Sequence, residues 1–176
     1  MQIRCRGGTK EIKQLTREVA EFCASKLVSA RMANTLELWF HFKHIDGENW
    51  GDCIWEDDDV RPRIFSMDIH FDKDPEKRDY AKVLKTICHE MVHVKQWAKG
   101  EMKQSYRPYG YTRFLGELYP DTMDYWDTPW EIEAYGREPG LYTRWVDETG
   151  RTGDPIFDTR LDKEEKEEIL LDNTPN

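Results

Sequence analysis

The stretch of the chain that decides its fold is Asp74–Gly100, which reads DPEKRDYAKVLKTICHEMVHVKQWAKG. Its apolar residues recur at spacings of three and four, which is the period of an amphipathic helix. Asp74 is a favourable N-cap, Pro75 suits the first helical position, and Gly100 suits the position just after a helix. The sequence therefore predicts one helix from about Pro75 to Lys99.

The two faces of this predicted helix differ in chemistry. Because successive side chains are about 100° apart, His89 and His93 project from one face, one turn apart. Cys88 points away from His89, towards the apolar side, and we expect it to pack in the core. One face should pack and the other should face a cleft. The apolar face is made of Tyr80, Val83, Leu84, Ile87, Met91, Val94 and Ala98.

The residues before this helix predict another helix and a small sheet. Residues 9–31 have a helical period with Thr9 as N-cap. Residues 36–42 and 50–55 flank a turn-like DGEN segment and predict a hairpin, and residues 63–71 alternate like a third strand. The predicted class is α+β, with a small antiparallel or mixed sheet of three or more strands. We expect an extended peptide to add to the 63–71 strand as a sheet edge.

The residues after the helix predict a loop region, a second helix and a tail. Residues 101–130 have no sustained period and are expected to wall a cleft as irregular structure. Pro129 opens a helical stretch that closes near Pro139 or continues to Val146. Residues 155–176 form an acidic tail that we expect to be loosely ordered at its end. With 176 residues, the chain suits a single domain over residues 1–176.

Charge and hydropathy exclude several classes of protein. The net charge is -9, with acidic runs at residues 56–59 and 162–168, so no nucleic-acid partner is expected. No stretch approaches the about 18 consecutive apolar residues of a membrane span, so we expect no membrane partner. Residues 1–6 lack the apolar run of a signal peptide, which predicts a cytoplasmic location. The four cysteines form no Cys-x-x-Cys pair, which predicts free thiols.

The histidine face of the helix carries the motif His89-Glu90-Met91-Val92-His93. Two imidazoles one helical turn apart have the spacing needed to hold one zinc ion. Glu90, about a quarter turn away, is placed to act as general base on a water molecule rather than as a ligand. Zn²⁺ lowers the pKa of such a water and polarises a carbonyl. The motif therefore predicts zinc-dependent hydrolysis of a peptide bond.

The third zinc ligand must come from another element. There is no histidine after His93, so a third histidine downstream is excluded. A site of two histidines and one carboxylate stays possible, with the carboxylate on the second helix. Glu131 and Glu133 are the leading candidates, and Asp127 and Glu138 are weaker ones.

Two motifs resemble those of a known family. The pattern His89-Glu90-x-x-His93, followed by Glu131-Ile132-Glu133-Ala134, resembles the gluzincin metallopeptidases and is similar to the small SprT-like and ImmA/IrrE-like zincin domains. The resemblance implies a zincin-like fold, a Zn²⁺ cofactor and a peptide or protein substrate. It also favours Glu131 as the third ligand.

A developing oxyanion needs an electrophile besides the metal, and Tyr135 on the second helix is our candidate. Other side chains of suitable chemistry, more typical of packing, are Tyr109, Tyr111, Tyr142 and Arg144. The remaining histidines, His41, His44 and His70, lie on strands or at their ends, and we expect them to be exposed or satisfied locally.

Two classes of function fit these residues. The first is an active zinc metallopeptidase with His89, His93 and Glu131 as ligands, Glu90 as base and Tyr135 as electrophile. The alternative is a catalytically weak or inactive zincin-fold module that binds a protein partner. A purely structural zinc site is disfavoured, because four closed ligands are not in evidence in the sequence.

Overall fold

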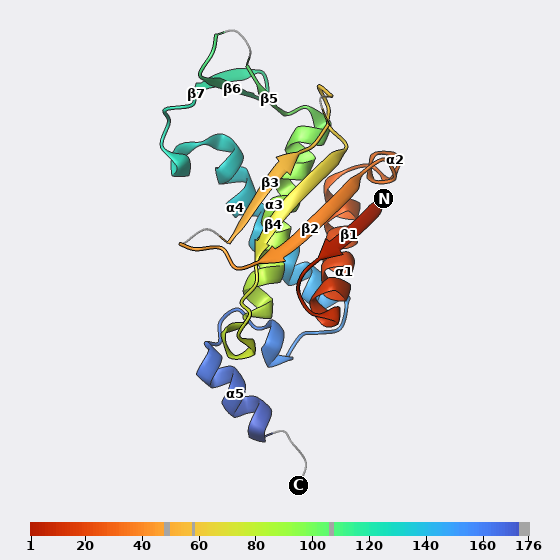
Figure 1. The fold of residues 1–176 in the computed structure, drawn as a ribbon, viewed down its shortest axis with the longest axis vertical. Helices are drawn as coiled ribbons and strands as arrows, with labels where there is room; N and C mark the ends of the chain where they lie inside the picture. The colour runs from red at the N-terminus through yellow and green to blue at the C-terminus, as the bar shows by residue number, and fades with distance from the viewer. Residues whose placement is uncertain (48–49, 58, 106–107, 173–176) are drawn as a thin grey trace.

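A mixed four-stranded sheet with strand order β1-β2-β4-β3 lies at the centre of the fold (Figure 1). The computed structural model describes residues 1–47, 50–57, 59–105 and 108–172. The first three strands in this order are parallel, and the last is antiparallel to its neighbour. The predicted α+β class is confirmed. The strands are β1 (Gln2–Arg6), β2 (Glu37–Lys43), β3 (Gly51–Trp55) and β4 (Ile64–His70).

Two helices connect β1 to β2, because parallel neighbours need a crossover connection. They are α1 (Lys10–Leu27) and the short α2 (Ala30–Ala33). Thr9 caps α1, as predicted, by accepting a hydrogen bond from the Ile12 amide at 3.1 Å. The single helix predicted for residues 9–31 is wrong at its end, because Val28 is extended and Ser29 caps a separate helix.

The hairpin predicted for residues 36–42 and 50–55 is wrong. β2 and β3 do not pair with each other, because β4 lies between them and pairs with both. The inward residues of β4, Phe65, Met67 and Ile69, are fully buried and take the central position. β3, with Gly51 and an exposed Asp52, suits an edge. Residues 48–49 of the predicted turn lie outside the described residues.

This order also corrects the predicted peptide-binding edge. The strand predicted at residues 63–71 corresponds to β4, which has β2 on one side and β3 on the other. An extended peptide has no free edge there. The edge of the sheet on this side is β3.

The long helix begins later than predicted. Asp74 and Pro75 start a 3-10 helix, η1 (Pro75–Lys77), and the chain then extends at Arg78. Asp79 caps α3 (Tyr80–Lys99) by accepting a hydrogen bond from the Lys82 amide. Gly100 ends α3 in the left-handed conformation, as predicted, with φ 69°.

The prediction of irregular structure for residues 101–130 is wrong in part. The segment forms a three-stranded antiparallel sheet followed by a 3-10 helix. Residues 106–107 lie outside the described residues. These strands are so short that their alternation is weak in the sequence. The elements are β5 (Met102–Gln104), β6 (Tyr111–Phe114), β7 (Glu117–Pro120) and η2 (Tyr125–Asp127).

The second predicted helix is α4 (Pro129–Glu148), which continues through Pro139. Its buried residues beyond the proline, Leu141, Tyr142 and Trp145, anchor this half in the core. Two further elements follow, η3 (Pro155–Phe157) and α5 (Lys163–Asp172). Residues 173–176, where loose order is predicted, lie outside the described residues.

Three helices build the layers behind the sheet. In Figure 1, α1 and α3 lie against one face of the sheet, and α4 packs behind α3. The small sheet lies beside the end of α3, and α5 lies at the opposite end of the molecule. None of the helices in the described ranges is both long enough and apolar enough to cross a membrane.

Candidate metal centre

Three buried side chains bring potential metal ligands together. His89 Nε2 and His93 Nε2 lie 3.1 Å apart. His89 Nε2 lies 3.2 Å from Glu131 Oε2, and His93 Nε2 lies 3.4 Å from Glu131 Oε1. All three residues are at most 9% exposed. A buried group of two imidazoles and one carboxylate is able to hold a metal ion.

The helical period and helix packing produce this arrangement. His89 and His93 stand one turn apart on α3, so their rings point the same way. Glu131 lies in the first turn of α4, which packs along α3. The sequence placed the two histidines on one face, and the packing of α4 brings Glu131 to them.

Both histidines are oriented through their other ring nitrogen. His89 Nδ1 lies 3.0 Å from Glu138 Oε2, and His93 Nδ1 lies 2.9 Å from Gln96 Oε1. When each Nδ1–H donates to its oxygen partner, each Nε2 keeps its lone pair and faces Glu131. Ligand histidines in metalloproteins are commonly held in this way.

Glu133 is separated from the two ligand histidines. Its carboxylate accepts hydrogen bonds from Lys95 at 2.6 Å, from Gln96 Nε2 at 3.1 Å and from Arg137 at 2.7 Å. The sequence left Glu131 and Glu133 open as ligands, and the structure brings only Glu131 into the buried group. Glu133 instead holds Gln96, which in turn holds His93.

Glu90 lies against the backbone of β3. A Cβ atom on Gly51 would stand 2.5 Å from Glu90 Oε1 and 2.6 Å from Thr86 Cγ2, so only glycine leaves room for this carboxylate. Burial raises the pKa of Glu90 to about 7, although the nearby His93 and His89 act in the opposite direction. The carboxylate is thus held next to the ligand histidines without belonging to the ligand group.

A cleft of about 480 Å³ opens onto these residues. The ligand group and Glu90 lie along its wall, and β3 contributes Gly51, Cys53 and Trp55. One end carries Trp50 and Lys82, whose ammonium group lies 3.6 Å from the centre of the Trp50 ring. The other end carries Trp55, Trp97 and Met102. The cleft is therefore elongated along α3, with the ligand group in its wall.

Two tyrosines border the cleft beside Glu131. The Tyr135 ring packs edge-on against the His89 ring, with centroids 4.5 Å apart. The Tyr125 hydroxyl donates a hydrogen bond of 2.8 Å to Glu131 Oε2. Burial and hydrogen bonds with Tyr135 and Glu131 raise the pKa of Tyr125, so its hydroxyl stays protonated. Tyr135 was singled out in the sequence, whereas Tyr125 was not.

The charges in the site stabilise one another. Burial disfavours the charged form of His89, but hydrogen bonds to Glu131 and Glu138 outweigh it and raise the pKa of His89 to about 9. Burial also disfavours the Glu131 carboxylate, but hydrogen bonds from His89 and His93 lower its pKa to about 2. Without a metal ion, protons on the imidazoles therefore compensate the buried carboxylate.

The weaker candidates of the sequence lie elsewhere. Asp127 is exposed in η2, and Glu138 contacts His89 Nδ1 rather than the ligand group. Four residues weighed as electrophiles, Tyr109, Tyr111, Tyr142 and Arg144, do not line the cleft among the described residues. His41, His44 and His70 do not line it either.

Cys88 packs in the core, as predicted, with its sulfur 3.7 Å from that of Cys23. The described cysteines are free, as predicted.

Sequence reasoning gives Glu138 only as a weaker candidate for a ligand and assigns no role to Gln96, although the sequence contains a signal for the contact that each makes with a histidine. Glu138 follows Glu131 by seven residues, which places both on one face of α4. Gln96 follows His93 by three residues, which places it one turn along α3. Tyr125 has no such signal, because it reaches Glu131 from η2 through a turn.

Comparison with known proteins yields no match. No family model matches the chain, and neither a curated protein nor a solved structure matches it significantly. What the site is able to do therefore follows from its own residues.

Proposed function

We propose that this protein is a zinc-dependent peptidase with a zincin-like fold. One observation carries the proposal: two histidines fixed through Nδ1 and a buried carboxylate converge beside a glutamate, on the wall of a cleft. This combination suits hydrolysis, because three protein ligands leave one position of a tetrahedral metal open.

Zinc fits the donor set and its spacing. Donor atoms about 2.0–2.2 Å from a tetrahedral zinc ion stand roughly 3.4 Å apart. The three distances in the group are 3.1, 3.2 and 3.4 Å. Imidazole and carboxylate ligands also favour Zn²⁺ over Mg²⁺ or Ca²⁺, which prefer oxygen ligands alone.

Each residue of the site has its own role in the proposed hydrolysis. A zinc ion held by His89, His93 and Glu131 would supply Lewis acidity, which activates water and polarises a peptide carbonyl. Glu90 takes a proton from the attacking water and passes it to the leaving amine. Gly51 keeps the Glu90 carboxylate close to the ligands. Tyr135, which packs against His89, donates a hydrogen bond from its hydroxyl group to the developing oxyanion.

The substrate is a peptide or protein segment bound in extended form. β3 is the edge of the sheet, and its residues line the cleft beside the ligand group. An edge strand offers unpaired backbone amides and carbonyls, with which an extended peptide pairs. Pairing along β3 aligns a peptide bond with Glu90 and the metal ligands. The edge proposed for binding is therefore β3, in place of the strand chosen from the sequence.

Glu90→Gln tests the proposal directly. Zinc-loaded protein and the variant are incubated with fluorescently labelled, unfolded casein, and peptide release is measured. The variant should lose about 10²–10⁴-fold in rate, because the amide cannot accept the proton, while keeping its zinc. Glu21→Gln, an exposed acid on α1, is the matched control and should cleave like the parent.

Two results would contradict the mechanism. Normal cleavage by Glu90→Gln would remove Glu90 as the base. Absence of cleavage by the zinc-loaded parent across unfolded protein substrates would favour the module that binds a partner without hydrolysis.

A further inference from the structure

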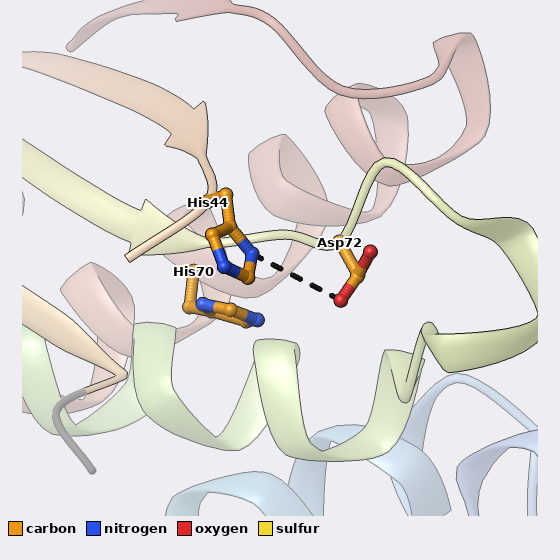
Figure 2. A group of neighbouring side chains, drawn as sticks. All are labelled: His44, His70 and Asp72. Carbon is orange, nitrogen blue, oxygen red and sulfur yellow. Dashed lines mark ion pairs between the residues drawn. The ribbon is translucent and has the colours of Figure 1, made fainter. Parts of the chain in front are cut away.

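A second group of possible metal ligands lies outside the cleft, at the carboxyl ends of β2 and β4. His44 follows β2, His70 ends β4, and Asp72 lies in the turn that follows. Figure 2 shows the two rings one above the other, with the Asp72 carboxylate facing them from the side. The ring centroids are 5.0 Å apart, and potential ligand atoms of all three residues lie within 4.8 Å of one another.

In each of the three residues, the side-chain atom that faces away from the other two contacts a neighbouring group. His70 Nδ1 lies 3.0 Å from the Ile45 carbonyl oxygen and 3.1 Å from the Ile45 amide nitrogen, and Asp72 Oδ1 accepts a hydrogen bond of 2.9 Å from the Asp74 amide. His44 Nε2 lies 3.3 Å from Asp46 Oδ1. In the tautomers in which His44 Nε2 and His70 Nδ1 carry the protons, with His70 Nδ1 donating to the Ile45 carbonyl oxygen instead of accepting from the Ile45 amide, His44 Nδ1 and His70 Nε2 keep their lone pairs.

The facing atoms of His44 and Asp72 are spaced for an ion rather than for a direct bond. His44 Nδ1 and Asp72 Oδ2 stand 3.9 Å apart, which is too long for a hydrogen bond. Donors of one tetrahedral ion stand roughly 3.4 Å apart. His44 Nδ1 and Asp72 Oδ2 would reach this spacing if they moved about half an ångström closer together. The His44 side chain is 48% exposed and is free to move by this amount.

Two positive side chains near the group, those of Arg78 and Lys43, are engaged elsewhere. The Arg78 guanidinium donates to the Asp72 and Lys73 carbonyl oxygens and lies over the Phe71 ring. Lys43 forms its ion pair with Asp68. Hydrogen bonding from the Asp74 amide also lowers the pKa of Asp72, so its carboxylate is ionised at neutral pH.

We propose that His44, His70 and Asp72 bind a divalent transition-metal ion at a second, exposed site. The contacts that hold His70 and Asp72, and the 3.9 Å gap between His44 Nδ1 and Asp72 Oδ2, are the observations that support it. Two imidazoles and one carboxylate suit Zn²⁺, Ni²⁺ or Cu²⁺ and disfavour Mg²⁺ and Ca²⁺. The site is more exposed than the centre at His89, so it binds metal more weakly and exchanges it faster with solvent.

The site also touches the wall of the cleft. The Trp50 ring packs on His70, with centroids 4.6 Å apart, and Trp50 lines the cleft that contains Glu90. An ion bound to His70 therefore lies next to a fluorescent side chain of the cleft wall. Ni²⁺ at this site should quench Trp50 emission.

Equilibrium dialysis of the full chain against Zn²⁺ tests this inference. The parent should bind about two zinc ions per chain, and His44→Ala should bind about one. Asp72→Asn, which keeps the shape of the side chain, should lose the same ion. His41→Ala removes another partly exposed histidine, on β2, and should bind like the parent. Excess Mg²⁺ should displace none of the zinc.

The outcomes separate the two sites. If His44→Ala and Asp72→Asn bind as much zinc as the parent, there is no second site. If His41→Ala loses zinc to the same extent, binding is a general property of surface histidines, and the proposal is also wrong. Glu131→Ala is expected to lose the other ion and to keep the quenching of Trp50 by Ni²⁺.

Discussion

Each ligand histidine in the centre is fixed through Nδ1 by a different kind of partner. Glu138, a carboxylate, holds His89, whereas Gln96, a neutral amide, holds His93. The negative partner adds basicity to its ring, and the amide only orients it. Glu133 accepts a hydrogen bond from Gln96 Nε2 and so fixes the amide that holds His93. The two histidines are therefore supported unequally.

Glu138→Ala should weaken zinc binding by about 10–100-fold, because His89 loses the partner that orients its ring. Glu138→Gln should recover part of this loss, since its amide oxygen still accepts from Nδ1–H. Competition with a fluorescent chelator measures the affinity. Glu148→Ala, on the exposed part of the same helix, should match the parent. Equal affinities for Glu138→Ala and the parent would show that this contact does not support the metal.

The two tyrosines are expected to differ in what they support. Tyr125→Phe removes the hydrogen bond to Glu131, so zinc affinity should fall by about tenfold. Tyr135→Phe should keep zinc and lower kcat by about 10²–10³-fold, because it removes a donor to the oxyanion. Chelator competition and steady-state kinetics measure the two effects. If Tyr135→Phe keeps full kcat while Tyr125→Phe loses it at saturating zinc, the electrophile is Tyr125.

At the level of elements, the close approach of β3 to α3 places Glu90, the proposed base. Glu90 is buried between the two, against Gly51, and borders the cleft. The cleft therefore depends on the contact between β3 and α3, which are separated in the sequence but adjacent in space.

Gly51→Ala tests this contact. The new methyl group would overlap Glu90 Oε1 and Thr86 Cγ2, so the base should be displaced and kcat should fall by at least about tenfold. Zinc content should stay unchanged. Gly136→Ala is the matched control, because nothing lies within 4 Å of its added Cβ and alanine favours a helix. The control should raise stability by about 0.5–1 kcal/mol. Normal kcat in Gly51→Ala would show that Glu90 tolerates the methyl group.

The elements also show what a sequence can and cannot predict. The helical period fixes which way His89 and His93 point, and Thr9 and Gly100 mark helix ends reliably, because these features are local. Strand pairing is not local, so an alternating pattern predicts β2 and β3 but not that β4 separates them. The choice of Glu131 over Glu133 depends on how α4 packs on α3, which the period of one helix does not contain.

For the whole molecule, the proposed zinc ion would replace protons in the centre. In metal-free protein, the raised pKa of His89 stabilises the fold below about pH 6.5. This contribution is lost as the pH rises through about 9. The lowered pKa of Glu131 stabilises the fold above about pH 4.5, and that contribution is lost as the pH falls towards 2. The contribution of the His89–Glu131 pair is therefore largest between about pH 4.5 and 6.5.

Zinc binding should restore the stability that the metal-free protein loses at higher pH. Its binding requires unprotonated imidazoles, so the increase in Tm on adding zinc should be larger at pH 8 than at pH 5.5. Thermal unfolding of the His44→Ala variant, with and without zinc, measures this while leaving out the second site. An increase that does not depend on pH would show that the ion binds groups other than the histidines.

The whole-molecule account is tested most directly by counting zinc in variants of α4. In the His44→Ala background, equilibrium dialysis should give about one zinc ion per chain. Adding Glu131→Ala should weaken this binding by more than about 100-fold, because a ligand is lost. Adding Glu133→Ala should have a smaller effect, and circular dichroism should show both variants folded. If Glu131→Ala binds zinc as tightly as its parent, the centre described here is not the metal site.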